Sequence, residues 1–326
     1  MALDQYGRNI RYLRISLTDQ CNLRCRYCMQ ENQTFQPPEE LMQNDEVIRL
    51  ARIFVELGFD KFRLTGGEPT LRHDITGLVN SLTSLPGVRE TAMTTNGVLL
   101  KHLARPLRTA GLGRLNISID TLDPQRFKQI TRWGNFAEVW SGIMTAEAEG
   151  FPIKLNAVPV RGLNDRDDVV ALARLTLAHA WQVRFIEMMP FGGTAEFQRS
   201  HVVTQSELME TIAGELGPLA PVNGGKLDGE ARMYQLDGAR GQIGFISSVS
   251  NPFCAGCNRA RLTADGVLRL CLLRDKELPL LPLLRGGADD LEMRQTIENA
   301  IWFKPWGHGL AEKVYPRKRF MSEIGG

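Results

Sequence analysis

Residues 12–28 read YLRISLTDQCNLRCRYC and join a strand-like segment to three closely spaced cysteines. The segment 12–18 is predicted to be a β-strand. Cys21, Cys25 and Cys28 follow it directly. Three thiolates leave one position open, because tetrahedral zinc and a cuboidal iron–sulfur cluster both take four ligands. The stretch therefore predicts a strand that ends in a metal or cluster site with one ligand missing.

The same order of strand and helix recurs along the first two thirds of the chain. The clearest helix is expected over 44–59, with Asn44 as its cap and Gly58 at its end. Six such units predict an α/β fold with an incomplete (β/α)6 TIM-like barrel. Pro/Gly-rich turns and short strands follow, so we expect a barrel domain over 1–215 and a C-terminal domain over 216–326. The expected strands are 12–18, 61–65, 90–95, 114–119, 153–160 and 183–189.

Composition excludes several classes of protein. The chain has 326 residues, 43% of them hydrophobic, which is enough for an extensive core. The net charge of +2 gives no reason to expect nucleic-acid binding. No signal peptide or membrane span is indicated, so a cytoplasmic protein is expected. All six cysteines fall into two groups of three, and in a reducing compartment such groups are more often metal ligands than disulfides.

Functional groups of parallel β/α folds gather on the loops that follow the strands. Here the first expected strand leads into the three cysteines, and the next three lead into TGGEP at 65–69, TTNG at 94–97 and SIDT at 118–121. The fifth carries Lys154 and Asn156, and the sixth ends at Glu187, Met188 and Met189. We expect these groups to converge on one mouth of the barrel.

The spacing C-x3-C-x2-C, with Tyr27 before its last cysteine and GGEP after the next strand, resembles the signature of radical S-adenosylmethionine enzymes. The resemblance implies that Cys21, Cys25 and Cys28 hold three irons of a 4Fe-4S cluster, and that S-adenosylmethionine chelates the fourth. The reduced cluster then cleaves the cofactor to a 5′-deoxyadenosyl radical, which abstracts a hydrogen atom. By the same resemblance, the residues that contact S-adenosylmethionine are Tyr27, Gly67, Ser118 and Met189.

The second cysteine group, Cys254, Cys257 and Cys271, again supplies three ligands and predicts a second 4Fe-4S cluster with an open iron. Arg259 and Arg261 lie beside it in the sequence. One guanidinium group can bind two phosphate oxygens at once through two parallel hydrogen bonds. Together with YLRIS, KFRLTGGEP and the terminal IGG, these features resemble the GTP 3′,8-cyclase family of molybdenum cofactor biosynthesis.

This second resemblance implies a substrate, GTP, whose guanine meets the open iron of the second cluster. The radical removes the C3′ hydrogen, C3′ joins C8, and the product is 3′,8-cyclo-7,8-dihydroguanosine 5′-triphosphate. An electron donor and a downstream cyclic pyranopterin monophosphate synthase are implied as partners, and a homodimer is left open. Gly325 and Gly326 are implied to reach the active site, consistent with their lack of side chains. The implied GTP-binding residues are Arg14, Arg63, Thr94, Lys154, Arg184, Arg259 and Arg261.

Each feature also has a simpler interpretation. The first cysteines could form a zinc site with a distant ligand, Gly66 and Gly67 a tight turn, and Tyr27 or the methionines part of the core. The arginines could form ordinary salt bridges, and the last residues could be frayed. Two other functions stay open: a peptide-modifying radical enzyme with an auxiliary cluster, and an iron–sulfur electron carrier, which would normally use four cysteines for each cluster.

Overall fold

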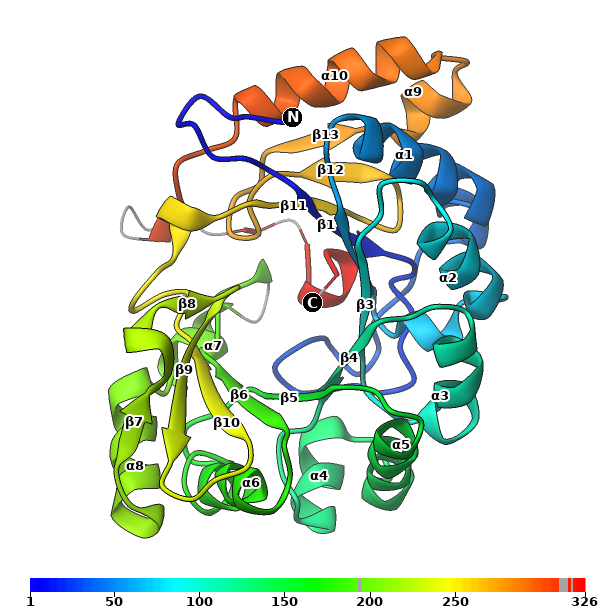
Figure 1. The fold of residues 1–326 in the computed structure, drawn as a ribbon. Helices are drawn as coiled ribbons and strands as arrows, with labels where there is room; N and C mark the ends of the chain where they lie inside the picture. Colours follow the sequence, from blue (N-terminus) through cyan, green and yellow to red (C-terminus); the bar gives the residue numbers. More distant parts are fainter. Residues whose placement is uncertain (193–194, 311–315, 318, 326) are drawn as a thin grey trace.

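The computed structural model describes residues 1–192, 195–310, 316–317 and 319–325. Strands and helices alternate through its first half and surround a common centre, with the helices outside (Figure 1). The barrel units contain β1 (Tyr12–Ser16), α1 (Asn44–Glu56), β2 (Lys61–Thr65), α2 (Ile75–Thr83), β3 (Glu90–Thr95), α3 (Leu100–Thr109), β4 (Arg114–Ser118), α4 (Pro124–Thr131), α5 (Phe136–Ala148), β5 (Ile153–Ala157), α6 (Asp167–Ala178) and β6 (Gln182–Ile186).

Further strands and helices follow β6, and several of them extend the same sheet. They are α7 (Ala195–Ser200), α8 (Gln205–Leu216), β7 (Leu219–Pro221), β8 (Leu227–Asp228), β9 (Ala231–Leu236), β10 (Gln242–Ile246), β11 (Arg259–Leu262), β12 (Val267–Arg269), β13 (Glu277–Pro279), α9 (Leu281–Arg285) and α10 (Asp290–Trp302).

In the part of the chain that the structure describes, one curved sheet of thirteen strands organises the molecule. Its order is β13-β12-β11-β1-β2-β3-β4-β5-β6-β10-β9-β7, with β8 paired to β9. Strands β1 to β6 are parallel neighbours in sequence order, which confirms the predicted incomplete barrel. The C-terminal part adds strands to both edges of this six-stranded sheet, because β10 pairs with β6 and β11 pairs with β1. The division of the chain at residue 215 stays a prediction.

The first helix shows how local sequence sets an element. Val47, Leu50, Ile53 and Phe54 recur at helical spacing and are buried against the sheet. The expected cap was wrong by one residue: Gln43 is the N-cap, and its backbone N–H donates to the Glu46 carboxylate at 2.7 Å.

The ends of the expected elements also differ from the structure. The helix ends at Glu56, three residues before the expected end, and Gly58 follows with a positive φ of +97°. Four expected strands are also shorter at their carboxyl ends, because the chain leaves the ladder there to form the loops of the site.

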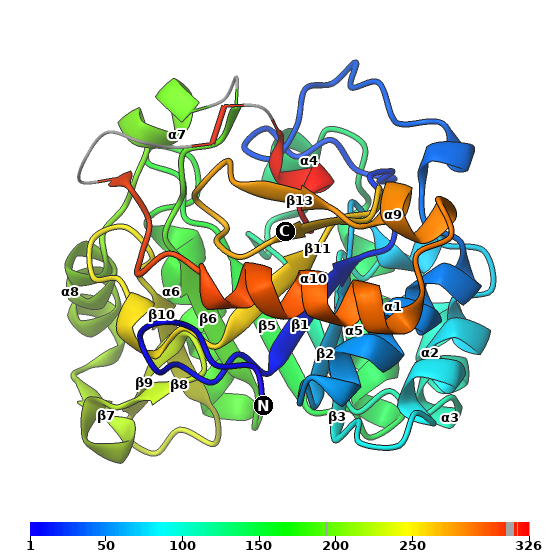
Figure 2. The ribbon, with the colours of Figure 1, turned by 90° about the horizontal axis from the view of Figure 1, so that it is seen from above.

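The N-terminal segment lies on the outside of the barrel, whereas the C-terminal segment lies inside it (Figures 1 and 2). The N-terminal segment lies beside α10, where the Gln5 N–H donates to the Trp302 carbonyl at 3.1 Å (Figure 2). The C-terminal segment turns inward and lies within the ring of strands (Figures 1 and 2). Among the described residues, no helix has both the length and the apolar character needed to cross a bilayer.

Candidate functional site

The expected mouth of the barrel is a hollow of about 310 Å³ that both cysteine groups border. Loops after β1 to β6 meet residues of the C-terminal part there, so the expected convergence is confirmed. Lys154 and Gly325 lie close by but do not line the hollow, and Gly326 lies outside the described residues. The predicted site residues in its wall are Arg14, Cys21, Cys25, Tyr27, Cys28, Arg63, Gly67, Thr94, Ser118, Arg184, Met189, Cys254, Cys257, Arg259, Arg261 and Cys271.

The first cysteine loop is built from tight local hydrogen bonds. The Cys28 N–H donates to the Cys25 carbonyl at 2.9 Å, and the Leu23 N–H points at Cys21 Sγ at 3.4 Å. Burial, and to a lesser extent the neighbouring Glu68 carboxylate, raises the pKa of Cys21 to about 11. Burial and the neighbouring thiol of Cys21 likewise raise the pKa of Cys28 to about 12. Bound cations would favour the thiolate forms of this loop.

The TGGEP loop holds neighbouring loops together. A Cβ on Gly67 would lie 2.3 Å from the Gln20 carbonyl oxygen, so only glycine lets this loop pack against the chain that leads to Cys21. Glu68 is fully buried, and its carboxylate accepts hydrogen bonds from the Asn96 N–H at 2.7 Å and the Thr95 hydroxyl at 2.7 Å. The motif drew attention to this loop, but the sequence did not indicate that Glu68 joins it to the loop after β3.

Tyr27 is hydrogen-bonded as well as packed. Its hydroxyl donates to the Asp120 carboxylate at 2.8 Å, and its carbonyl accepts from Gln198 at 3.0 Å. Asp120 also accepts from the Val158 N–H at 2.8 Å, while burial raises the pKa of this carboxyl to about 6. The ring of Tyr27 is therefore fixed in the wall of the hollow, between the cysteine loop and β4. Sequence reasoning missed Asp120, which stands inside the SIDT motif.

The second cysteine group is supported by buried cations that sequence reasoning also missed. Lys304 is 2% exposed, and its ammonium donates to the carbonyls of Arg259, at 2.8 Å, and Leu270. Arg8 donates to the Cys254 carbonyl at 2.8 Å. Burial opposes ionisation of Cys257, but Lys304, Arg259 and a backbone N–H outweigh it and lower its pKa.

The chemistry of both cysteine groups fits an iron–sulfur cluster, because each group supplies three thiol donors. Within residues 1–192, 195–310, 316–317 and 319–325, no three His, Cys, Asp or Glu side chains are grouped to bind one common ion. Each thiol group also has the soft donors that such clusters require.

The pairing of β1 with β2 and with β11 places three of the predicted phosphate-binding arginines side by side. Arg14 on β1 lies opposite Arg63 on β2 and opposite Arg261 on β11. Arg184 on β6 donates to the Asn156 side chain at 3.0 Å. Burial, followed by repulsion from Arg63, lowers the pKa of both Arg14 and Arg184 to about 10, so both stay charged near neutral pH.

Carboxylates from one hairpin pair with this cation set. Glu230 is buried and lies 2.6 Å from an Arg259 nitrogen and 3.9 Å from an Arg14 nitrogen. Asp228 lies 3.8 Å from the Lys154 ammonium. The salt-bridge interpretation of these cations therefore holds for three of them, although the pairs lie beside or within the hollow and not on an outer helix face.

The chain end approaches the same arginines. The Gly325 carbonyl accepts from Arg261 at 3.3 Å and from Arg14 at 3.5 Å. Ile324 is buried in a small cluster with Phe191. Gly325 has φ +76°, and a Cβ there would lie 2.4 Å from Thr65 Oγ1. The described part of the C-terminus is thus packed into the molecule.

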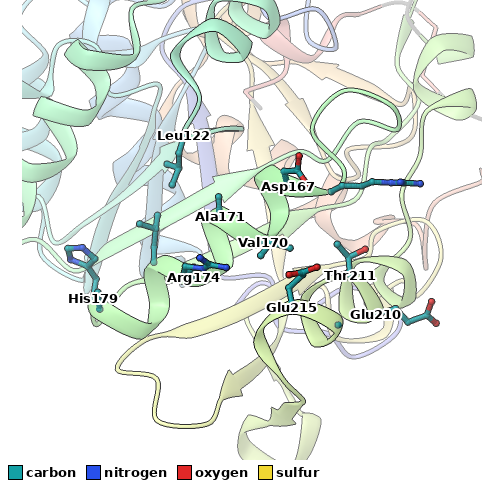
Figure 3. Close-up of a pocket in the computed structure, with 13 residues that line it drawn as sticks. Leu122, Asp167, Val170, Ala171, Arg174, His179, Glu210, Thr211 and Glu215 are labelled. Carbon is teal, nitrogen blue, oxygen red and sulfur yellow. The ribbon is translucent and has the colours of Figure 1, made fainter.

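A larger and more open hollow of about 1050 Å³ lies on the outside, between α6 and α8. Asp167, Val170 and Arg174 of α6 border it opposite Thr211 and Glu215 of α8 (Figure 3). None of the predicted site residues lines it. The predicted site residues that line a hollow thus border the one at the mouth of the barrel and not this one.

Two family models match the chain. Residues 15–175 match the Radical SAM superfamily, and residues 181–310 match Molybdenum Cofactor Synthesis C. Curated relatives align over nearly the whole length. GTP 3′,8-cyclases of Pelotomaculum thermopropionicum and Thermodesulfovibrio yellowstonii are each 44% identical, and that of Moorella thermoacetica is 43% identical. Each alignment covers 99% of this chain and 99% of the relative.

Solved structures share the fold at much lower identity. The crystal structure of Streptococcus suis SuiB bound to precursor peptide SuiA is 14% identical, with a TM-score of 0.62. That alignment covers 94% of this chain and 66% of SuiB. A second SuiB structure has a TM-score of 0.59 at 14% identity, covering 96% and 68%. Such similarity supports the architecture alone.

Proposed function

The chain belongs to the GTP 3′,8-cyclase family of radical S-adenosylmethionine enzymes, and from this membership we propose how its cysteine groups and cations share the work. It is an enzyme, a lyase that converts GTP to 3′,8-cyclo-7,8-dihydroguanosine 5′-triphosphate in molybdenum cofactor biosynthesis. The observation that carries the residue-level proposal is a single hollow bordered by both cysteine groups and by a row of arginines.

We assign Cys21, Cys25 and Cys28 to the 4Fe-4S cluster that this superfamily implies. When bound and reduced, this cluster and S-adenosylmethionine supply the radical that removes the C3′ hydrogen of GTP. Two features of the chain hold the walls of this site in place: the hydrogen bond from Tyr27 to Asp120, and the packing of the TGGEP loop against the cysteine loop. The proposed S-adenosylmethionine contacts are Tyr27, Gly67, Ser118 and Met189, all of which line the hollow.

The cations suit the triphosphate end of the substrate. A triphosphate carries several negative charges close together, and buried guanidinium groups bind such oxygens through charge-assisted pairs of hydrogen bonds. Arg63, Arg14 and Arg261 stand side by side across three strands, so their charges add at one place. The proposed GTP-binding residues are Arg14, Arg63, Thr94, Lys154, Arg184, Arg259 and Arg261.

The guanine end is proposed to lie toward Cys254, Cys257 and Cys271, which would hold a second 4Fe-4S cluster with one open iron. Support comes from the three-thiol donor set and from Lys304, which joins the segments that contain Cys257 and Cys271. Gly325 and Gly326 are proposed to complete the site from the chain end. The first of them already lies against two of the substrate cations.

Further parts of the proposal concern the setting of the enzyme. An electron donor must supply the reduction, and a cyclic pyranopterin monophosphate synthase is the proposed next enzyme. We also propose a cytoplasmic location and leave a homodimer open. The barrel over 1–215 and the C-terminal part over 216–326 are proposed as the two domains.

Anaerobic reconstitution with iron and sulfide, followed by S-adenosylmethionine, dithionite and GTP, tests the function. We expect 5′-deoxyadenosine and a product with the mass of the cyclised triphosphate. Deoxyadenosine formation that GTP does not stimulate, with no cyclised product, would indicate a different substrate, such as a peptide. Absence of deoxyadenosine from a fully loaded protein would favour an electron carrier.

Single cysteine variants separate the two groups. Cys25→Ala should abolish cleavage of S-adenosylmethionine, because it removes a ligand of the first cluster. Cys257→Ala should spare some uncoupled cleavage and stop cyclisation. Robust deoxyadenosine formation by the Cys25 variant would contradict the assignment of the first group.

A further inference from the structure

The hairpin of β8 and β9 places two carboxylates among the substrate cations. Asp228 pairs with Ala231 across it, and Gly229 and Glu230 form its two-residue loop. Gly229 has φ +65°, as the first central residue of a tight hairpin requires. Residues 226–229 are exposed, whereas Glu230 is buried. The hairpin therefore stands at the edge of the sheet and turns one acidic side chain inward.

One of these carboxylates, Glu230, spans the open side of the barrel. Strand β9 lies near one end of the curved sheet, while β11, which begins at Arg259, extends the other end beyond β1 (Figure 1). The 2.6 Å ion pair between Glu230 and Arg259 connects the two ends. Asp228 reaches Lys154 on β5 at 3.8 Å. Three proposed GTP-binding residues, Arg14, Lys154 and Arg259, are thus paired with acids of one hairpin.

In the free protein, these ion pairs reduce the repulsion among the buried cations. Buried cations repel one another, and burial followed by repulsion from Arg184 lowers the pKa of Lys154 to about 8. A buried carboxylate within the set offsets part of that repulsion. In the substrate complex the same carboxylate would face phosphate oxygens, and like charges at such distances are unfavourable.

We propose that Asp228 and Glu230 are internal counter-ions, which occupy Lys154, Arg14 and Arg259 in the free protein and release them to the triphosphate of GTP. The inference rests on the proposed role of these cations in binding GTP. Ligands with several negative charges replace both acids at once, while an uncharged nucleoside replaces neither. The hairpin therefore lowers the affinity for charged nucleotides and leaves the affinity for an uncharged nucleoside unchanged.

Charge-neutral variants measured by calorimetry test the inference on anaerobically reconstituted protein. Glu230→Gln keeps the shape of the side chain and removes its charge. It should lower the Kd for GTP about ten-fold, and that for inorganic tripolyphosphate by a similar factor, where ten-fold corresponds to about 1.4 kcal/mol. Asp228→Asn should have a smaller effect, about two- to three-fold, because this acid is exposed and its pair is screened.

Two controls make the result specific. Asp237→Asn removes the same charge from an exposed turn at the other end of β9 and should leave both Kd values unchanged. Binding of guanosine should not respond to Glu230→Gln. Thermal unfolding of each variant shows whether the fold is intact.

An unchanged or weaker affinity of folded Glu230→Gln for tripolyphosphate would overturn the inference, since Glu230 would then be a fixed structural partner or an orienting group. An equal gain from Asp237→Asn would overturn it too, because the effect would be one of net charge. Failure of the underlying function is seen separately: Arg259→Ala would then bind GTP as tightly as the unaltered protein.

Discussion

Gly325→Ala adds one methyl group at the point where the chain end meets the wall of the hollow. The new Cβ would lie 2.4 Å from Thr65 Oγ1, whereas ordinary contacts begin near 3.4 Å. The tail or the strand must therefore shift by about 1 Å, and Thr65 is fixed in β2. The Gly325 carbonyl is already 3.3 Å from Arg261 and 3.5 Å from Arg14, so such a shift breaks both hydrogen bonds.

The free-energy change follows from two contributions. An alanine at φ +76° costs about 1 kcal/mol in the left-handed region. The two hydrogen bonds to arginine are long, at 3.3 and 3.5 Å, so their combined loss is taken as that of one good hydrogen bond to a charged group, about 1.5–3 kcal/mol. Their sum, about 3 kcal/mol, lowers the population of the docked tail on the order of a hundred-fold. If the docked tail is required for catalysis, cyclisation should fall by about ten- to a hundred-fold.

Anaerobic product formation at saturating GTP measures the loss, and 5′-deoxyadenosine reports uncoupled cleavage in the same sample. Gly150→Ala is a matched control, because Gly150 has the same φ of +76° and a Cβ there would meet no atom within 4 Å, so only the backbone contribution applies. Thermal unfolding of Gly325→Ala should change little. Full cyclisation by Gly325→Ala, or an equal loss in Gly150→Ala, would refute the reasoning.

Three further changes test other parts of the site. Arg261→Ala should weaken GTP binding about ten- to a hundred-fold while S-adenosylmethionine binding is retained, and calorimetry that finds equal loss of both would indicate misfolding instead. Lys304→Met removes the ammonium that donates to two buried carbonyls. The iron content should therefore drop by the amount that the second cysteine group binds, and the free energy of unfolding should fall by about 1–3 kcal/mol. Unchanged iron content and stability would contradict this. The folded pKa of Asp120, about 6, exceeds the unfolded value of 3.8, so its contribution to stability falls as pH rises from 3.8 to about 6. Urea unfolding of Asp120→Asn and of the unaltered protein should therefore give a difference in the free energy of unfolding that is more favourable to the variant at pH 7 than at pH 4. An equal difference at the two pH values would count against this.

The sequence was sufficient for features that depend on local patterns. Strand and helix periodicity predicted β1 to β6 in order, because each element buries its own apolar residues at its own spacing. Cysteine spacing was equally informative, since Cys21, Cys25 and Cys28 lie on one loop that follows β1 and borders the hollow. The resemblance to radical S-adenosylmethionine enzymes rested on such local motifs, and the comparisons confirmed it.

Only the tertiary structure decided which distant residues meet. Strand β11 pairs with β1 in a register that sets Arg261 beside Arg14, and no local pattern contains that register. The same holds for Glu230 and Lys304, single charged residues whose sequence surroundings do not differ from those of a solvated surface residue. Their burial depends on free energies shared among several elements, because a charge leaves water only where partners from other parts of the chain compensate it.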